Sequence, residues 1–161
     1  MRLVVEHSFA VTCDAYESLY FDEPFNAALG TALGLGRELV SLDRTATRIV
    51  RIVRCEPKRD PNSPGGQAFG KSRASFVEEI DYDRTTRVGA WKTVPNVFPD
   101  RVRSTGTLEL VADGAGVKRI VRAEVVVRAF GFGGRIEKLI AHEIEQSYAK
   151  SAAFTTAWLA R

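Results

Sequence analysis

Apolar and polar residues follow two different periods along this chain. From about residue 36 to residue 129, apolar residues recur at every second position and turn-forming residues interrupt them, which predicts strands joined by tight turns. After Gly131–Gly134 the spacing changes to three and four, which is typical of an amphipathic helix. We therefore predict one long helix from Arg135 to Arg161. Its apolar stripe consists of Ile136, Leu139, Ile140, Ile144, Tyr148, Phe154 and Trp158. The residues expected to face water on its other side include Glu137, Glu145 and Lys150.

The N-terminal part of the chain predicts a strand followed by two short helices. Residues 2–12 alternate, so that one face of the strand is apolar and the other polar. The residues on the apolar face are Leu3, Val5, His7, Phe9 and Val11. Asp14 is expected to cap the first helix, and Pro24 to open the second, which ends near Gly30.

The middle of the chain predicts the remaining strands of an antiparallel sheet. These strands lie at about residues 37–44, 46–56, 70–81, 86–95, 101–112 and 116–129. Residues 57–66 are rich in proline and glycine, which predicts a long loop. Asp113–Gly116 predicts a hairpin turn between the last two strands. With the N-terminal strand, the sheet has about seven strands.

This order of elements predicts a single α+β domain that spans residues 1–161. A chain of 161 residues can bury one substantial core, and no internal repeat or linker divides it. A long amphipathic helix needs a broad apolar surface to cover, and a curved antiparallel sheet provides one. We therefore expect a helix-grip fold, in which a curved antiparallel sheet surrounds the C-terminal helix and two short helices follow the first strand.

Composition narrows the functional classes only a little. The net charge is +3 and the pI is about 9.0, which permits contact with an anionic membrane surface but does not favour nucleic-acid binding. Cys13 and Cys55 cannot form a disulfide framework, and we expect both to be reduced and buried. The N-terminus lacks the apolar core of a signal peptide, and no apolar run reaches the ~20 residues of a membrane span. We therefore expect a cytoplasmic protein.

Three consecutive segments carry a resemblance to a known superfamily. They are Thr105–Leu108, the strand at Val121–Phe130, and the glycine turn with the start of the helix at Gly131–Glu137. In these segments, and in its order of elements, the chain resembles the START-like (SRPBCC) superfamily, which includes the polyketide cyclases and the Bet v 1 allergens. It is most similar to small bacterial START-like proteins of unknown function, and it is also similar to VASt domains, which carry sterols. The resemblance implies a helix-grip fold with a cavity for a hydrophobic ligand between sheet and helix.

A search for catalytic and metal-binding motifs yields none that we assign. Gly131, Gly133 and Gly134 do not fit the dinucleotide-binding GxGxxG pattern, and they follow an antiparallel strand. The chain has no GxSxG elbow and only two histidines, His7 and His142. A metal site would need a set of converging ligands, which these two residues do not supply. We therefore expect no metal ion and no cofactor.

Three polar residues stand at inward positions of the predicted sheet. His7 lies on the apolar face of the first strand, Arg119 lies on that of the last strand, and Glu78 shares a face with Ile80. These groups would form a polar patch in an apolar pocket, because burial without partners is costly. The alternative is a shift of register by one residue, which would bury Val77 and leave Glu78 in water.

Aromatic residues are distributed so that they would line the interior between sheet and helix. They are Phe69, Phe76, Tyr82, Trp91, Phe98, Tyr148 and Trp158. Each one could simply fill the core, but together they favour a large apolar cavity. Val97 and Phe98, which lie between Pro95 and Pro99, would be either a membrane-touching or lid element or a buried anchor of their loop. The basic residues nearby, which would favour an anionic surface, are Lys58, Arg59, Arg101 and Arg103.

These observations lead to three hypotheses about function. The first, which we prefer, is non-enzymatic binding or transfer of a hydrophobic small molecule such as a lipid, a sterol or a polyketide-like compound. The second is a cyclase- or dehydratase-type enzyme that uses the same cavity, with His7 and Glu78 as candidate acid or base. The third is a protein-interaction module, which would need an exposed apolar patch that the charged outer faces of the strands do not offer.

The preferred hypothesis names a set of ligand-binding residues and of partners. The candidate ligand-binding residues are Phe76, Glu78, Trp91, Phe98, Arg119, Ile140, Ile144 and Tyr148. The expected partners are a hydrophobic small-molecule ligand and, transiently, an anionic membrane surface, but no nucleic acid.

Overall fold

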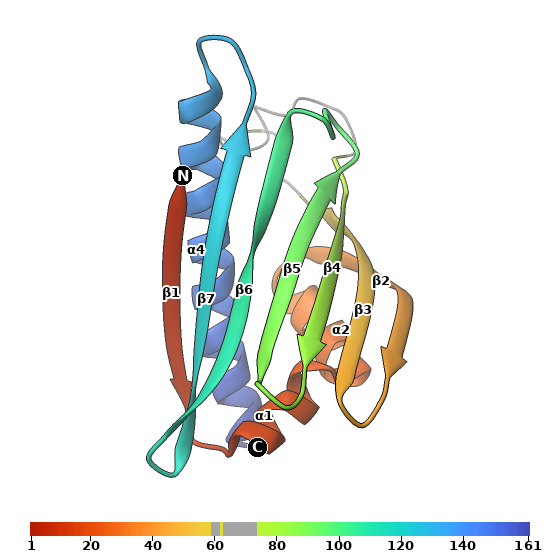
Figure 1. The fold of residues 1–161 in the computed structure, drawn as a ribbon, viewed down its shortest axis with the longest axis vertical. Coiled ribbons are helices and arrows are strands. Elements are labelled where there is room, and N and C mark those ends of the chain that lie inside the picture. Colours follow the sequence, from red (N-terminus) through yellow and green to blue (C-terminus); the bar gives the residue numbers. More distant parts are fainter. Residues whose placement is uncertain (59–61, 63–73) are drawn as a thin grey trace.

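The computed structural model describes residues 1–58, 62 and 74–161, and its elements follow the predicted order (Figure 1). The strands are β1 (Arg2–Phe9), β2 (Leu35–Arg44), β3 (Arg48–Pro57), β4 (Phe76–Asp83), β5 (Val88–Pro95), β6 (Val102–Asp113) and β7 (Gly116–Val127). The helices are α1 (Cys13–Tyr20), α2 (Glu23–Ala32) and α4 (Gly133–Leu159). The strand predicted at 70–81 begins only at Phe76, and its residues 70–73, like most of the predicted loop 57–66, lie outside the described residues.

The strands form one antiparallel sheet of seven strands in the order β1-β7-β6-β5-β4-β3-β2. The first strand therefore pairs with the last one, and the other neighbours are consecutive hairpins. The helices of the described residues lie on the same face of the sheet, with α4 behind β1 and β7 and the two short helices behind the other strands (Figure 1). The predicted helix-grip architecture is confirmed.

The register of the strands decides which side chains face the helices. His7 lies opposite Arg119, and Glu78 lies between Val53 and Thr93 of the neighbouring strands. Glu78 thus shares the inner face with the fully buried Ile80 and Tyr82, so the predicted inward position is correct and the shifted register is wrong. The buried apolar residues of this face include Leu3, Phe9, Ile49, Val53, Ile80, Tyr82, Trp91, Leu108, Leu110, Val117, Val121 and Val125.

The two short helices begin where polar side chains cap them. Thr12, and not Asp14 as predicted, is the N-cap of α1, because its hydroxyl accepts a hydrogen bond from the backbone N–H of Ala15 (3.2 Å). Asp14 lies in the first turn, where its charge favours the positive end of the helix dipole. In α2, Asp22 caps the helix and Pro24 occupies the first turn, as its fixed φ angle allows.

The start of α4 is tied to the sheet by a carboxylate. Glu137, which was expected to face water, accepts a hydrogen bond from the backbone N–H of Val127 (3.0 Å) and lies 3.5 Å from the N-terminal amino group of Met1. These contacts, above all the hydrogen bond from Val127, lower the pKa of Glu137. Glu137 is therefore only partly exposed, because it contacts Val127 of β7 and Met1, which precedes β1, whereas Glu145 and Lys150 are exposed as predicted.

Candidate functional site

A cluster of polar side chains lies on the inner face of the sheet, under the helices. It draws on six elements: His7 of β1, Tyr16 and Tyr20 of α1, Arg51 of β3, Glu78 of β4, Arg119 of β7 and Tyr148 of α4. Stacking between Tyr16 and Tyr20 (6.2 Å between ring centroids) links the side of the cluster around Arg119 to the side around Arg51.

Arg119 is the most deeply buried member, with 1% of its surface exposed. Its guanidinium donates to the Tyr16 hydroxyl (2.9 Å) and to the backbone carbonyl of Tyr148 (3.4 Å), and it lies 3.2 Å from His7 Nδ1. The rings of Phe9 and Tyr148 stand 5.4 and 5.0 Å from its central carbon, within the range of cation–π contacts. Its Nε has no hydrogen-bond partner among the described residues. The positive charge is therefore held by neutral groups.

Arg51 occupies the other side of the cluster and is also buried, with 4% of its surface exposed. It donates to the backbone carbonyl of Tyr20 (2.8 Å) and lies over the rings of Tyr20 and Phe21. One oxygen of Glu78 lies 3.7 Å from its Nη2, which is too long for a hydrogen bond but close enough for an ion pair. Its Nε, too, has no partner within the described structure.

Tyr20 and Tyr148 belong to the cluster, but part of each side chain is still accessible to water. Burial raises the pKa of Tyr20 to about 12 and the pKa of Tyr148 well above its ordinary value, yet both side chains are only half-buried. Neither ring is sealed in the core, although both belong to the polar cluster.

His7 is held as a neutral imidazole. Burial, and then the positive charge of Arg119, lower its pKa from the ordinary value of 6.5. A neutral ring lets Nδ1 accept a hydrogen bond from the Arg119 guanidinium, and this contact fixes the tautomer with the proton on Nε2.

We expect His7 to make the stability of the protein depend on pH. Since its folded pKa lies below 6.5, the folded state binds fewer protons than the unfolded state between these two values. The contribution of His7 is complete above pH 6.5 and is lost as the pH falls toward the folded pKa. Denaturant unfolding between about pH 7.5 and about pH 5 should show this loss, and His7→Gln should reduce it. The exposed His142 provides the control, since an equal reduction in His142→Gln would contradict the assignment.

The structure brings most of the predicted site residues to the inner side. Arg119 and Tyr148 are in contact, and Glu78 lies beside Arg51, so the predicted polar patch has two parts. The other predicted residues that lie on the inner face of the sheet or on the inner stripe of α4 are Phe76, Trp91, Ile140 and Ile144. Phe69 lies outside the described residues.

Phe98 is the predicted site residue that lies elsewhere. It is 61% exposed, adopts a positive φ of 53° in the connection between β5 and β6, and contacts the Arg101 guanidinium. The interpretation as a buried anchor is therefore wrong, and its contact with a membrane stays a prediction. Phe130 and Phe132 in the connection between β7 and α4 are exposed as well.

Sequence reasoning missed Arg51, Tyr16 and Tyr20. Arg51 stands in the same alternating positions as Ile49, Val53 and Cys55, so the two-residue period of the strand indicates that its side chain faces inward. The preference of charged residues for the surface argued against it. Tyr16 and Tyr20 are one turn apart on α1, and only the packing of this helix on the sheet reveals that they face Arg119 and Arg51.

The two cysteines are free and buried, as expected. Burial raises the pKa of the Cys55 thiol to about 12, so it stays protonated and is a poor nucleophile. No three histidine, cysteine, aspartate or glutamate side chains within residues 1–58 and 74–161 are grouped so that they could hold a metal ion. None of the helices in the described parts of the chain is long and apolar enough to cross a membrane.

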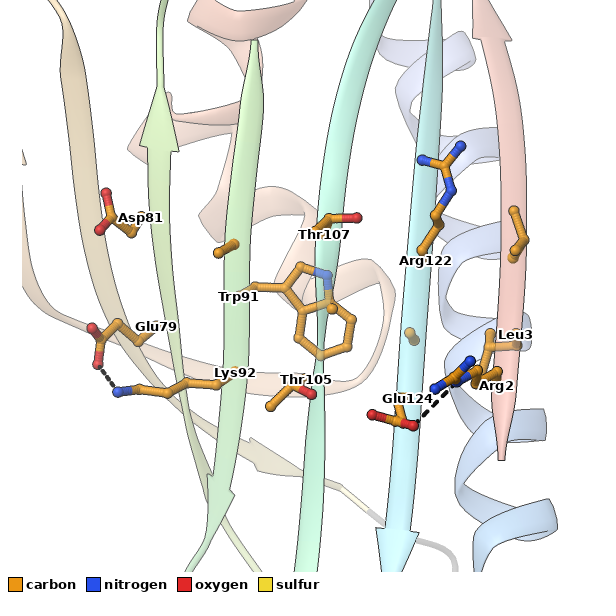
Figure 2. Close-up of a pocket in the computed structure, with 14 residues that line it drawn as sticks. Arg2, Leu3, Glu79, Asp81, Trp91, Lys92, Thr105, Thr107, Arg122 and Glu124 are labelled. Carbon is orange, nitrogen blue, oxygen red and sulfur yellow. Dashed lines mark hydrogen bonds and ion pairs between the residues drawn. The ribbon is translucent and has the colours of Figure 1, made fainter. Parts of the chain in front are cut away.

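A hollow of about 710 Å³ lies over the central strands and is lined mainly by residues that alternate with the inner-face residues (Figure 2). Its charged side chains form pairs, Glu79 with Lys92 at 3.1 Å and Arg2 with Glu124 at 3.2 Å. Because these charges offset one another at an exposed surface, this hollow does not match the expected apolar cavity. A cavity between the sheet and α4 therefore stays a prediction.

The fold is similar to several solved structures over nearly the whole chain. The protein TTHA0849 from Thermus thermophilus has a TM-score of 0.68 at 15% identity, and the match covers 98% of this chain and 95% of that one. A START superfamily protein from Mycobacterium smegmatis (TM-score 0.64, 15% identity) and Ara h 8.0201 (TM-score 0.67, 10% identity) are each matched over 98% of both chains. At these identities the similarity shows the fold alone, which is the START-like and Bet v 1-like fold that the sequence resembles.

The sequence comparisons identify the family. None of the curated proteins matches the chain. The family described as "Protein of unknown function (DUF2505)" matches residues 5–159, which is almost the entire chain. The protein therefore belongs to the DUF2505 family, which adopts the START-like helix-grip fold here.

Proposed function

We propose that this protein binds a hydrophobic small molecule between the inner face of the sheet and α4, as a binding or transfer protein. The START-like and Bet v 1-like fold commonly binds hydrophobic ligands, and the proposal extends this property to a particular place in this chain. A lipid, a sterol or a polyketide-like compound would suit an apolar site of this kind.

The observation that carries the proposal is an apolar inner surface that is packed on the core but not sealed. Ile140, Ile144 and Tyr148 of α4 and Val5 of β1 contact the buried cluster, yet each keeps part of its surface accessible. On β4, Phe76 points to the same side and is also half-buried. Covering this surface with an apolar ligand would contribute about 25 cal/mol for each Å² removed from water.

The packing of α4 supports the same location for the ligand. This helix packs on β1, β7 and α2, at one edge of the sheet. The inner stripe of α4, with Ile140, Ile144 and Tyr148, packs against the core at this edge. A ligand that lies beside α4 would contact the helix on one side and the sheet on the other.

The test uses N-phenyl-1-naphthylamine, a neutral apolar dye whose fluorescence rises when it leaves water. We expect saturable binding of the dye to the purified protein, and at least about tenfold weaker binding to Ile144→Trp, because the larger side chain occupies the proposed space. Lys150→Trp places the same side chain on the exposed side of α4 and should bind the dye normally. Binding that does not saturate, or that is equal in both variants, would contradict the proposal.

A cyclase- or dehydratase-type enzyme is the second candidate, and the state of His7 favours it. With its proton on Nε2, the neutral imidazole can donate a hydrogen bond to a substrate oxygen and stabilise negative charge that develops there. Glu78, the other candidate acid or base, lies beside Arg51 rather than beside His7, so the two would not act on one atom together. This candidate therefore depends on His7 alone.

A further inference from the structure

The described interior carries more positive than negative charge. Arg51 and Arg119 both point inward from the sheet, and the carboxylate of Glu78 lies beside Arg51. Glu17 is also buried, but it is bound to Arg84 at 2.6 Å and to the Tyr82 hydroxyl at 3.3 Å. One guanidinium is thus left without an anionic partner among the described residues. Burying a charge in this way is costly unless another charge offsets it.

Arg119 is the guanidinium that lacks the anion. Its partners are a tyrosine hydroxyl, a neutral imidazole and a backbone carbonyl, and its Nε–H has no acceptor among the described residues. The Tyr16 hydroxyl accepts from Arg119, which leaves its own O–H free to donate. The site therefore offers at least two hydrogen-bond donors around one positive charge, and this combination suits an oxyanion.

We propose that the ligand is an amphipathic carboxylate, with its carboxylate bound by Arg119 and Tyr16 and its apolar tail along Ile144 and Ile140 of α4. This inference rests on the proposed function and names the class of ligand. Arg51, Arg119 and Glu78 together leave one net positive charge, which a single carboxylate would neutralise. A phosphate dianion would instead leave the site with a net negative charge. Ile144 and Ile140 lie one and two turns before Tyr148 on the same face of the helix. An apolar tail that starts at the bound carboxylate would therefore run along these two side chains.

His7 and Tyr148 position the guanidinium in this site. His7 accepts from Arg119 only while it is neutral, and Tyr148 both accepts through its carbonyl and covers the guanidinium with its ring. Both contacts hold Arg119 in place and leave its Nε–H unpaired. The carboxylate would take this unpaired position, as charge-assisted hydrogen bonds are about twice as strong as neutral ones.

The experiment compares dodecanoate with dodecanol by isothermal titration calorimetry at neutral pH. These probes share the same tail and differ in the charge of the head group. We expect dodecanoate to bind at least about tenfold more tightly to the full chain. Arg119→Met should remove this preference without weakening the binding of dodecanol. It should also keep the melting temperature of the ligand-free protein equal or raise it, because an uncompensated buried charge is removed.

Two further variants separate the binding role from a structural role. Arg119→Gln keeps a hydrogen-bonding group without the charge and answers the question if Arg119→Met does not fold. Arg122→Gln removes a charge from the outer face of the same strand, where Arg122 pairs with Glu109, and it should leave the preference unchanged.

Each outcome bears on one of the two proposals. Equal affinities for the two probes, or a preference that persists in Arg119→Gln, would overturn the carboxylate site but leave the hydrophobic binding function standing. A large loss of melting temperature in both Arg119 variants would show that Arg119 is structural and would also overturn the site. If neither probe binds, the proposed function fails together with it.

Discussion

Deletion of α4 is expected to abolish cooperative folding. Residues 133–161 cover the edge of the sheet where β7 carries Val121 and Val125, both fully buried, and the helix contributes the buried Ala141 and Ala152. Without α4 this apolar surface would face water, because α4 is the helix that covers it. Circular dichroism and binding of a hydrophobic dye should show strand content without a cooperative thermal transition, as in a molten globule.

Single alanine substitutions measure how much individual side chains of α4 contribute to its contact with the sheet. Ile144→Ala and Ile140→Ala remove half-buried side chains, so we expect each to cost about 1–2 kcal/mol, less than the 2–5 kcal/mol of a fully packed site. The exposed Glu145 on the same helix provides a control, and Glu145→Ala should change the stability by less than about 0.5 kcal/mol. A truncated chain that still unfolds cooperatively would show that α4 does not hold the fold together.

Much of this fold follows from local patterns in the sequence. The period of two predicts every strand of the described sheet, because each strand buries one face and leaves the other in water. The bounds agree to within about three residues except at the start of β4, which begins at Phe76 and not at residue 70. The same alternation correctly places Glu78 and Arg119 inside, although both are charged. The element boundaries are less well predicted, because Thr12 and Asp14 are both good caps and only the backbone geometry distinguishes them.

The candidate site depends on contacts that local patterns do not contain. Tyr16 and Arg119 are 103 positions apart, and His7 and Arg119 are 112 apart, so their meeting reflects the pairing of β1 with β7 and the packing of α1. The contact between the sheet and α4 is set by where the helix packs on the sheet and not by the apolar stripe itself. The position of α4 at the β1–β7 edge was therefore not predictable from the chain.

Gly106→Ala is expected to be among the most destabilising single substitutions in the sheet. A Cβ atom at this position would lie 2.0 Å from the backbone oxygen of Arg122 and 2.6 Å from Trp91 Cζ2. The Trp91 ring extends from β5 across β6 at this residue, which is possible because Gly106 has no side chain (Figure 2). A backbone oxygen cannot move without disturbing the pairing of β6 with β7, so the substitution should cost about 3 kcal/mol or more. In a chain of this size that corresponds to a fall in melting temperature of roughly 6–12 °C.

Two measurements distinguish this clash from a general effect of alanine. Gly134→Ala introduces the same methyl group at the start of α4, where no atom lies within 4 Å, and should be neutral or stabilise by up to about 1 kcal/mol. The second measurement is the fluorescence of Trp91 in a Trp158→Phe background, since the chain has only two tryptophans. Trp91 is 8% exposed, so its emission should be that of a buried indole, and Gly106→Ala should shift it toward longer wavelength as the ring is displaced. An unchanged emission together with an unchanged melting temperature would mean that the ring does not lie against Gly106, and the packing of β5 on β6 would have to be revised.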